Sequence, residues 1–324
     1  MIKYSVIIPV KEINDYVRET IPKILEIKRN DYEIIIYPNI VSPESWPHTR
    51  QIATGRVGPG EKRSRALRDA QGEILVFFDD DSYPQIDYFD VLERAYQDAA
   101  VVAVGGPGIT PPHDNFWQKV SGAVFLSTLA GGFPERYVPI GSKRSVDDWP
   151  SVNLTIKTEV FRFLGGFDCA FWPGEDTKLC QDLLLKTGSQ VLYDPALIVY
   201  HHRRSGLRSH LRQIWGYGLH RGFFARILPQ TSRKLKYFIP SAFLLFVGMG
   251  VPLVMGVPSL RNIYVVGWLF YGIAITKALL DIWRFEKNPL LLLNTLYYIF
   301  FTHLVYGAGF IKGLFSQRLK STLR

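Results

Sequence analysis

Acidic residues are missing from one long part of this chain, and cysteine is scarce throughout it. No aspartate or glutamate occurs between Asp194 and Asp281, although the 324 residues include 29 acidic ones. With only Cys169 and Cys180, the chain has neither a disulfide framework nor a paired-cysteine metal site. Such cysteine usage favours a reducing compartment.

The acid-free part is basic first and apolar afterwards. The formal net charge of the chain is +9, and nine of its basic residues cluster just before a long apolar run. They are Arg203, Arg204, Arg208, Arg212, Arg221, Arg226, Arg233, Lys234 and Lys236. Basic residues beside an apolar segment favour the cytoplasmic side of a membrane with anionic lipids. Nucleic-acid binding is the rival explanation and is weaker because of the apolar flanks, so we expect membrane lipids and no nucleic acid as partners.

Three apolar segments are candidate membrane spans, at residues 237–257, 263–280 and 289–311. A buried core helix is the alternative for any one of them, but three in succession favour a membrane. Three full spans would place Lys312, Arg318, Lys320 and Arg324 opposite the catalytic domain, against the positive-inside tendency. Either that bias is broken, or one segment is re-entrant or lies in the interface.

The first 200 residues read as an α/β domain with a mostly parallel sheet. Apolar strands alternate with helical stretches, as in βαβ units. A Gly- and Pro-rich loop over 55–60 precedes a basic helix, and residues 107–150 are irregular and expected to shape the acceptor side. The expected strands are 4–10, 33–37, 74–78, 101–104, 152–156 and 190–193, and the expected helices are 14–28, 61–70 and 176–187.

Three consecutive carboxylates, Asp79, Asp80 and Asp81, follow the fully apolar strand that ends at Phe78. In open α/β sheets, ligands bind just beyond the carboxyl ends of such strands. Three like charges there repel each other unless a cation offsets them. We therefore expect Mg2+ or Mn2+, which usually shares its ligands with substrate phosphates.

A second acidic pair, Glu175 and Asp176, begins the helix expected after the turn at Gly165-Gly166. Helix capping is the structural alternative for a carboxylate in a first turn. Together with the aspartate triplet, the pair favours a functional site.

This ordered series resembles the family-2 glycosyltransferases of the GT-A fold. The opening strand Val6-Ile-Ile-Pro9-Val10, a D-x-D motif at Asp79-Asp80-Asp81, an E-D motif at Glu175-Asp176 and a histidine in Tyr200-His201-His202 match it over roughly residues 1–220. The segment from Arg212-Gln213 to Trp215 is loosely similar to the Q-x-x-R-W region of membrane-bound members. The resemblance implies a Rossmann-like GT-A catalytic domain over 1–200, basic interfacial helices over 201–236 and two to three transmembrane helices over 237–324.

The resemblance also implies roles for individual residues. Asp81, Asp79 and His201 are the expected metal ligands, and Asp176 is the expected general base, with Glu175 orienting the acceptor or the base. The expected nucleotide-sugar contacts are Pro9, Glu12, Lys62, Arg63, Asp79, Asp80, Trp172, Arg204 and Gln213. The segment Tyr37-Pro38-Asn39 lacks the acidic residue that reads the base in many members, so UDP is only the default donor nucleotide.

We expect a multi-pass membrane enzyme with a cytoplasmic catalytic domain. It would move a sugar, with inversion, from a nucleotide-sugar donor to a lipid-linked or surface glycan acceptor. A polyprenyl-phosphate monosaccharide synthase is the close alternative. A membrane-bound nucleotidyltransferase is the alternative from another class, although Val10-Lys11-Glu12 stands where such enzymes carry a Gly-rich, Arg-containing loop.

Overall fold

The computed structural model describes residues 2–168, 171, 174–317 and 319. Its contacts divide the chain into two compact units. The first contains the chain up to Pro111 together with Val138–His202, and the second contains Pro112–Tyr137 and Arg203–Lys320.

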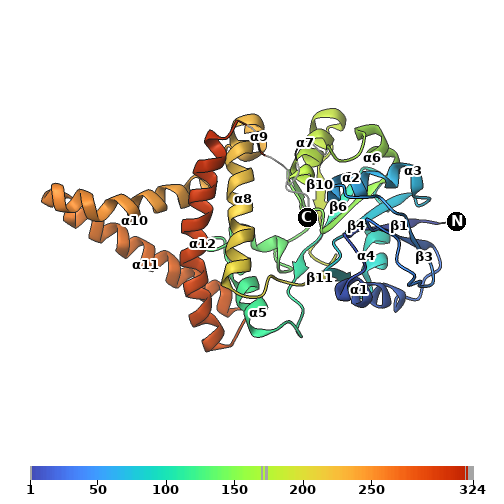
Figure 1. Ribbon diagram of the computed structural model, residues 1–324, viewed down its shortest axis with the longest axis horizontal. Coiled ribbons are helices and arrows are strands. Elements are labelled where there is room, and N and C mark those ends of the chain that lie inside the picture. Colours follow the sequence, from blue (N-terminus) through green and yellow to red (C-terminus); the bar gives the residue numbers. More distant parts are fainter. Residues whose placement is uncertain (1, 169–170, 172–173, 318, 320–324) are drawn as a thin grey trace. The chain divides into compact units, whose positions relative to one another are not determined.

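The first unit is built on an eight-stranded mixed sheet, visible in Figure 1. Six of its strands run in one direction, and β8 and β9 run against them. In spatial order the strands are β3 (Thr49–Gln51), β2 (Tyr32–Tyr37), β1 (Tyr4–Pro9), β4 (Ile74–Phe78), β9 (Asn153–Lys157), β6 (Ala103–Gly105), β10 (Val191–Tyr193) and β8 (Arg144–Val146). The predicted α/β class with a mostly parallel sheet is confirmed.

Helices cover both faces of this sheet, which explains why β4 is apolar throughout and β1 is apolar except for the buried Ser5. Val6 and Ile8 pack with α1 (Asp15–Leu25) and α4 (Tyr88–Ala95) on one face. Ile7 and Phe77 pack on the other face with α3 (Ala66–Asp69), α6 (Thr158–Leu164) and α7 (Glu175–Thr187). The single basic helix expected over 61–70 is instead two short ones, α2 (Pro59–Ser64) and α3, which meet at Arg65.

A second, three-stranded sheet was not expected from the sequence because its strands are too short to leave a pattern. It consists of β5 (Ser82–Pro84), β11 (Val199–His201) and β7 (Gly108–Ile109). Antiparallel pairing of β5 with β11 sets His201 opposite Ser82. This register carries the histidine to the loop that holds the aspartates.

The second unit is helical. The stretch expected to be irregular contains α5 (Phe116–Ala123), because Asn115 and Gln118 form a capping box there. Short 3-10 turns follow at Val124–Leu126 and Pro134–Arg136. The remaining helices are α8 (Leu207–Ile227), α9 (Pro229–Ser232), α10 (Ile239–Gly256), α11 (Arg261–Trp283) and α12 (Pro289–Phe315), with 3-10 turns at Leu235–Tyr237 and Pro258–Leu260.

Three segments of this unit, Leu235–Gly256, Pro258–Trp283 and Pro289–Phe315, are long and apolar enough to cross a membrane. The first helix after Arg203 in this unit, α8, is instead rich in arginine. Its buried His210 contacts Ser121 Oγ of α5 and Thr302 Oγ1 of α12, each at 2.8 Å. Burial lowers the pKa of His210 to about 4, so the ring is neutral near pH 7 and links three helices.

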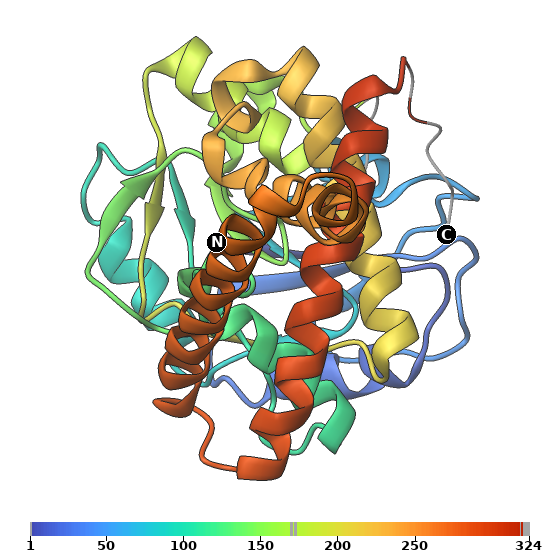
Figure 2. The ribbon, with the colours of Figure 1, turned by 90° about the vertical axis from the view of Figure 1, so that its left-hand side faces the viewer.

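Helices α8 and α12 lie side by side, as Figures 1 and 2 show, and glycines let their backbones touch. A Cβ at Gly218 or Gly222 of α8 would collide with the backbone of α12 near Tyr306 and Phe310. A Cβ at Gly313 of α12 would collide with the backbone of α8 at Leu219. Two Gly-x-x-x-Gly pairs, 218/222 and 309/313, thus face each other across the contact.

This contact gives a matched pair of substitutions. Gly222→Ala forces the two backbones apart and is expected to lower the free energy of unfolding by about 1–3 kcal/mol. Gly216 lies in the same helix, and a Cβ added there would meet no atom of another element within 4 Å. The higher helix propensity of alanine in Gly216→Ala should therefore raise the free energy of unfolding by about 0.5–1 kcal/mol. Thermal unfolding of the detergent-solubilised protein measures both. Equal shifts in the two variants would argue against the close α8–α12 contact.

Candidate active site

Two of the three consecutive aspartates converge with His201. Asp79 directly follows β4, and the β5–β11 pairing brings His201 Nε2 to 3.2 Å from Asp81 Oδ1. One ligand atom from each of Asp79, Asp81 and His201 lies within 4.8 Å of the others. Asp81 is only 4% exposed, so its charge is poorly solvated. Two carboxylates and one imidazole in this arrangement fit a Mg2+- or Mn2+-type ion, which favours oxygen ligands.

Asp80 lies outside this group of ligand atoms. Its Oδ2 accepts a 2.6 Å hydrogen bond from Asn14 Nδ2. Asn14 also caps α1, since its Oδ1 accepts from the backbone N–H of Val17 at 2.9 Å. Asn14 was not singled out from the sequence, although an asparagine just before a helix is a recognisable cap signal. It ties the loop that follows β1 to the aspartate loop.

Arg63 joins the two acidic motifs. Its side chain is 4% exposed and forms an ion pair with Asp79, and its second guanidinium nitrogen lies 3.3 Å from Glu175 Oε1. Two motifs nearly a hundred residues apart therefore share one guanidinium inside the first unit. A buried arginine with carboxylates on both sides places a fixed positive charge between them.

The acidic pair occupies the first turn of α7. Burial, together with the negative charge of Asp176, raises the pKa of Glu175 to about 7, although the positive charge of Arg63 opposes both effects. Asp176 accepts hydrogen bonds from the backbone N–H groups of Ser151 at 3.3 Å and Thr177 at 2.8 Å. Ser151 precedes β9, whose first residue pairs with Phe78 at the end of β4. Asp176 thus satisfies one free N–H group in the first turn of α7, and it lies at the same edge of the sheet as the aspartates.

The raised pKa of Glu175 predicts a pH-dependent stability. The folded form keeps a proton that the unfolded chain releases between the ordinary pKa of 4.5 and about 7, so the free energy of unfolding falls as pH rises through this window. The loss amounts to about 1.4 kcal/mol for each unit of pKa difference.

Glu175→Gln removes this titration. Its melting temperature relative to wild type should therefore increase between about pH 5 and about pH 8. The exposed Glu159→Gln is the matched control and should show a constant difference. A constant difference for Glu175→Gln would contradict the prediction.

Lys62 is buried and faces the chain itself. Its Nζ donates to Val10 O at 2.6 Å, Asn39 Oδ1 at 2.7 Å and Tyr37 O at 3.2 Å, and burial lowers its pKa to about 8. These contacts tie together the chain just beyond β1 and β2, beside the loop expected to meet the nucleotide base. Its contact with a diphosphate stays a prediction.

The other predicted nucleotide contacts are distributed as follows. Pro9 ends β1 and is buried, and Glu12 is exposed in the loop that follows. Arg204 and Gln213 belong to the second unit. Trp172 lies outside the described residues. Their roles stay predictions.

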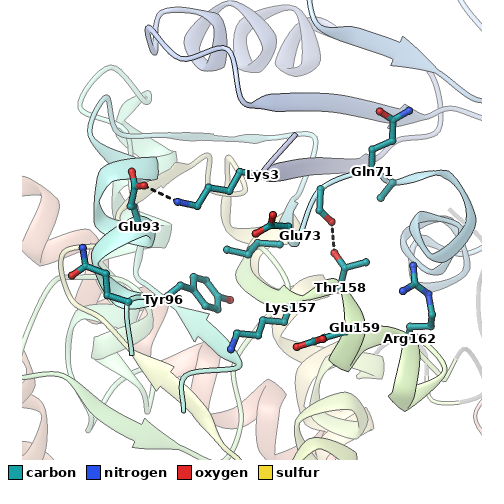
Figure 3. Close-up of a pocket in the computed structure, with 13 residues that line it drawn as sticks. Lys3, Gln71, Glu73, Glu93, Tyr96, Lys157, Thr158, Glu159 and Arg162 are labelled. Atoms are coloured by element: carbon teal, nitrogen blue, oxygen red, sulfur yellow. Dashed lines mark hydrogen bonds and ion pairs between the residues drawn. The ribbon is translucent and has the colours of Figure 1, made fainter. Parts of the chain in front are cut away.

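A cavity of about 670 Å³ lies at the opposite ends of the strands, as Figure 3 shows. Lys3 and Glu73, which precede β1 and β4, line it together with Lys157 and Arg162. Charges of both signs surround it, and Lys3 is paired with Glu93 at 2.6 Å. We place the site at the aspartates instead, because ligands bind beyond the carboxyl ends of the strands in such sheets.

Comparison with known proteins agrees with this geometry. The Glycosyl transferase family 2 profile matches residues 5–163. The chain therefore carries a family-2 glycosyltransferase domain, which confirms the resemblance and the enzyme class predicted from the motifs.

Curated relatives are distant. The chain is 27% identical over 161 residues to the pre-mycofactocin glycosyltransferase of Mycobacterium tuberculosis, in an alignment that covers 50% of this chain and 33% of that protein. The chain thus spans only about a third of that relative. It is 22% identical over 335 residues to a dolichyl N-acetyl-alpha-D-glucosaminyl phosphate 3-beta-D-2,3-diacetamido-2,3-dideoxy-beta-D-glucuronosyltransferase of Methanococcus voltae, which covers 96% of both chains.

A solved structure shares the fold. The mannosyltransferase PcManGT from Pyrobaculum calidifontis, solved with GDP-Man and Mn2+, superposes with a TM-score of 0.53 over 88% of both chains at 18% identity. This likeness confirms the predicted GT-A fold.

Proposed function

We propose that this protein is a membrane-anchored, metal-dependent glycosyltransferase that inverts the anomeric centre of the sugar it transfers. The donor is a nucleotide sugar, and the acceptor is a hydroxyl of a lipid-linked glycan at the cytoplasmic face. The observation that carries the proposal is the cluster of Asp79, Asp81 and His201, joined to Glu175 through Arg63 at one edge of a family-2 domain.

The residues of the cluster would hold the cation. Asp81 and Asp79 would supply carboxylate oxygens, and His201 would supply an imidazole nitrogen. When bound, a divalent cation offsets the negative charge of the departing diphosphate. The similar structure from Pyrobaculum calidifontis holds Mn2+ with a nucleotide sugar, which supports this choice of ion.

The chain's own residues supply the rest of the chemistry. The bond between the anomeric carbon and the diphosphate oxygen breaks while a new bond forms to the acceptor oxygen. Asp176 takes the proton of that acceptor hydroxyl, and attack from the opposite face inverts the anomeric configuration. Arg63 holds the carboxylate of Glu175 beside Asp176 and adds a fixed positive charge on the donor side.

The nature of the acceptor rests on two observations. Apolar helices follow the catalytic domain and the arginine-rich α8, which suits an acceptor held in a bilayer. The relative from Methanococcus voltae, which aligns with nearly the whole chain, has a name that describes transfer to a dolichyl-linked sugar. We therefore favour a lipid-linked sugar acceptor over a bare polyprenyl phosphate.

The experiment is a transfer assay on the purified full-length protein with Mn2+, a panel of UDP-, GDP- and dTDP-sugars, and polyprenyl-phosphate sugars as acceptors. We expect transfer of one intact sugar to lipid, lost on chelation with EDTA and restored by Mn2+. Product stereochemistry, read by NMR, should show inversion. Donor cleavage to a nucleoside monophosphate, or retention of configuration, would overturn the proposal.

A further inference from the structure

The helices α10 and α11 form a hairpin that leaves the α8–α12 pair. The hairpin extends sideways from that pair in Figure 1 and points toward the viewer in Figure 2. Near its beginning α10 meets α12, where Ser241 Oγ donates to Gly307 O at 3.1 Å. Further along, Gly250 packs under the ring of Tyr264 and Gly267 under that of Phe246, so the two helices contact each other.

This hairpin has the surface and length of a membrane-spanning pair. Large apolar side chains such as Leu245, Met249, Leu269 and Phe270 are at least half exposed. With 18 and 23 residues, α10 and α11 are roughly 27 and 35 Å long, close to the thickness of a hydrocarbon core. Its charged residues are Arg261 at the turn and the ion pair Lys277–Asp281 near the other end.

The third apolar helix, α12, is in a different situation because α8 runs beside it. The contacts follow each other along both helices: His210 with Thr302, Gly222 with Phe310, and Arg226 with Ser316. If α12 crossed the bilayer, it would carry α8 with it. The exposed Arg208, Arg212 and Arg226 would then lie at membrane depth, where charged side chains are costly.

The face of α12 that does not contact α8 is apolar. Leu290, Leu293, Tyr297 and Phe315 share that face at helical spacing and are 54–78% exposed. Meanwhile α8 exposes Arg208, Arg212 and Arg226. An apolar helix face beside arginines is typical of an element that lies in the membrane plane, with its apolar side in the acyl boundary and its cations at anionic headgroups.

We propose that α10 and α11 cross the bilayer as a hairpin, and that α12 lies with α8 in the headgroup–acyl boundary on the side of the catalytic domain. This inference rests on the membrane anchoring of the proposed function. Two crossings return the chain to its starting side, so Lys312, Arg318, Lys320 and Arg324 stay with the catalytic domain. The positive-inside bias is then satisfied.

Depth measurement tests the position of α12. Spin labels would be placed one at a time at Leu293→Cys, Leu304→Cys and Phe315→Cys of the full chain in bilayers, and their access to oxygen and to a polar nickel chelate compared. These sites span roughly 33 Å of helix, and we expect one shallow depth for all three. Labels at Leu245→Cys, Met249→Cys and Leu253→Cys are the matched series and should show a depth gradient. A gradient along α12 would overturn the proposal.

Sidedness is tested with a membrane-impermeant maleimide on sealed vesicles, in a Cys169→Ser background that retains the buried Cys180. Gln190→Cys reports the side of the catalytic domain. Gln317→Cys should be labelled from that same side, and Ser259→Cys, in the hairpin turn, only after permeabilisation. Labelling of Gln317→Cys from the far side means three spans, and labelling of Ser259→Cys from the near side means a hairpin that does not cross. Either result overturns the inference but does not affect the proposed sugar transfer, which the transfer assay tests separately. Release of the protein from membranes by alkaline carbonate would instead contradict membrane anchoring itself.

Discussion

Asp81→Ala is expected to reduce sugar transfer by about 10³-fold. Asp81 is buried and shares its surroundings with Asp79 and His201, so its loss removes one of three candidate ligand groups. A bound cation contributes several kcal/mol to a transition state in which charge develops, and each 1.4 kcal/mol or so is tenfold in rate. The measurement is kcat/KM with a saturating lipid acceptor.

A second readout separates loss of the ligand from loss of the fold. Wild-type protein should gain thermal stability when Mn2+ and donor nucleotide are added together, and Asp81→Ala should not. Asp90→Asn, an exposed carboxylate paired with Arg29, is the matched control and should retain both properties. Full activity of Asp81→Ala would show that Asp81 is not a metal ligand, and it would contradict the proposed metal site because Asp81 is the most buried of the three residues.

Asp176→Asn is expected to reduce transfer to a hydroxyl acceptor by about 10²–10⁴-fold, the range that general-base catalysis typically contributes. The amide keeps an oxygen that can accept from the N–H of Thr177, so the start of α7 should persist. The deficit should shrink at high pH, where more of the acceptor is ionised without help.

The same variant separates the two acceptor classes. A polyprenyl phosphate is already ionised, so a phosphate acceptor has no proton for Asp176 to remove, and Asp176→Asn would then change the rate only slightly. Assays with a polyprenyl phosphate and with a polyprenyl-phosphate sugar, side by side, distinguish these cases. A small effect with both acceptors would show that Asp176 serves only to accept the backbone N–H groups of Ser151 and Thr177.

Local pattern was sufficient to predict several features of the first unit. The apolar runs of β1 and β4 predicted strands buried on both faces, because consecutive apolar residues point alternately to the two sides of a sheet. The abrupt change from the apolar Phe78 to the charged Asp79 showed where β4 leaves the core, and it therefore predicted one edge of the site. This change lies between adjacent residues, so it is visible in the sequence. The Gly165-Gly166 turn and the acidic pair at Glu175 likewise predicted the start of α7.

Short elements and helix boundaries were beyond such patterns. Strands β5, β7 and β11 have two or three residues each, too few for an alternation to be visible. The helix α5 was hidden in a stretch rich in Pro, Gly and aromatics, and only its Asn115–Gln118 capping box marks it. The basic helix after the Gly-rich loop was predicted as one piece because both of its parts are good helix formers.

Which motifs share one site is a property of the folded chain. Pairing of β5 with β11 brings His201 to Asp81, and the buried guanidinium of Arg63 joins Asp79 to Glu175. It is also only in three dimensions that α12 lies along α8, so that an apolar segment typical of a span has arginines beside it. Local composition determines whether a segment can be buried. The segment that it packs against is distant in sequence, and it is selected by backbone pairing and close glycine contacts that no local pattern encodes.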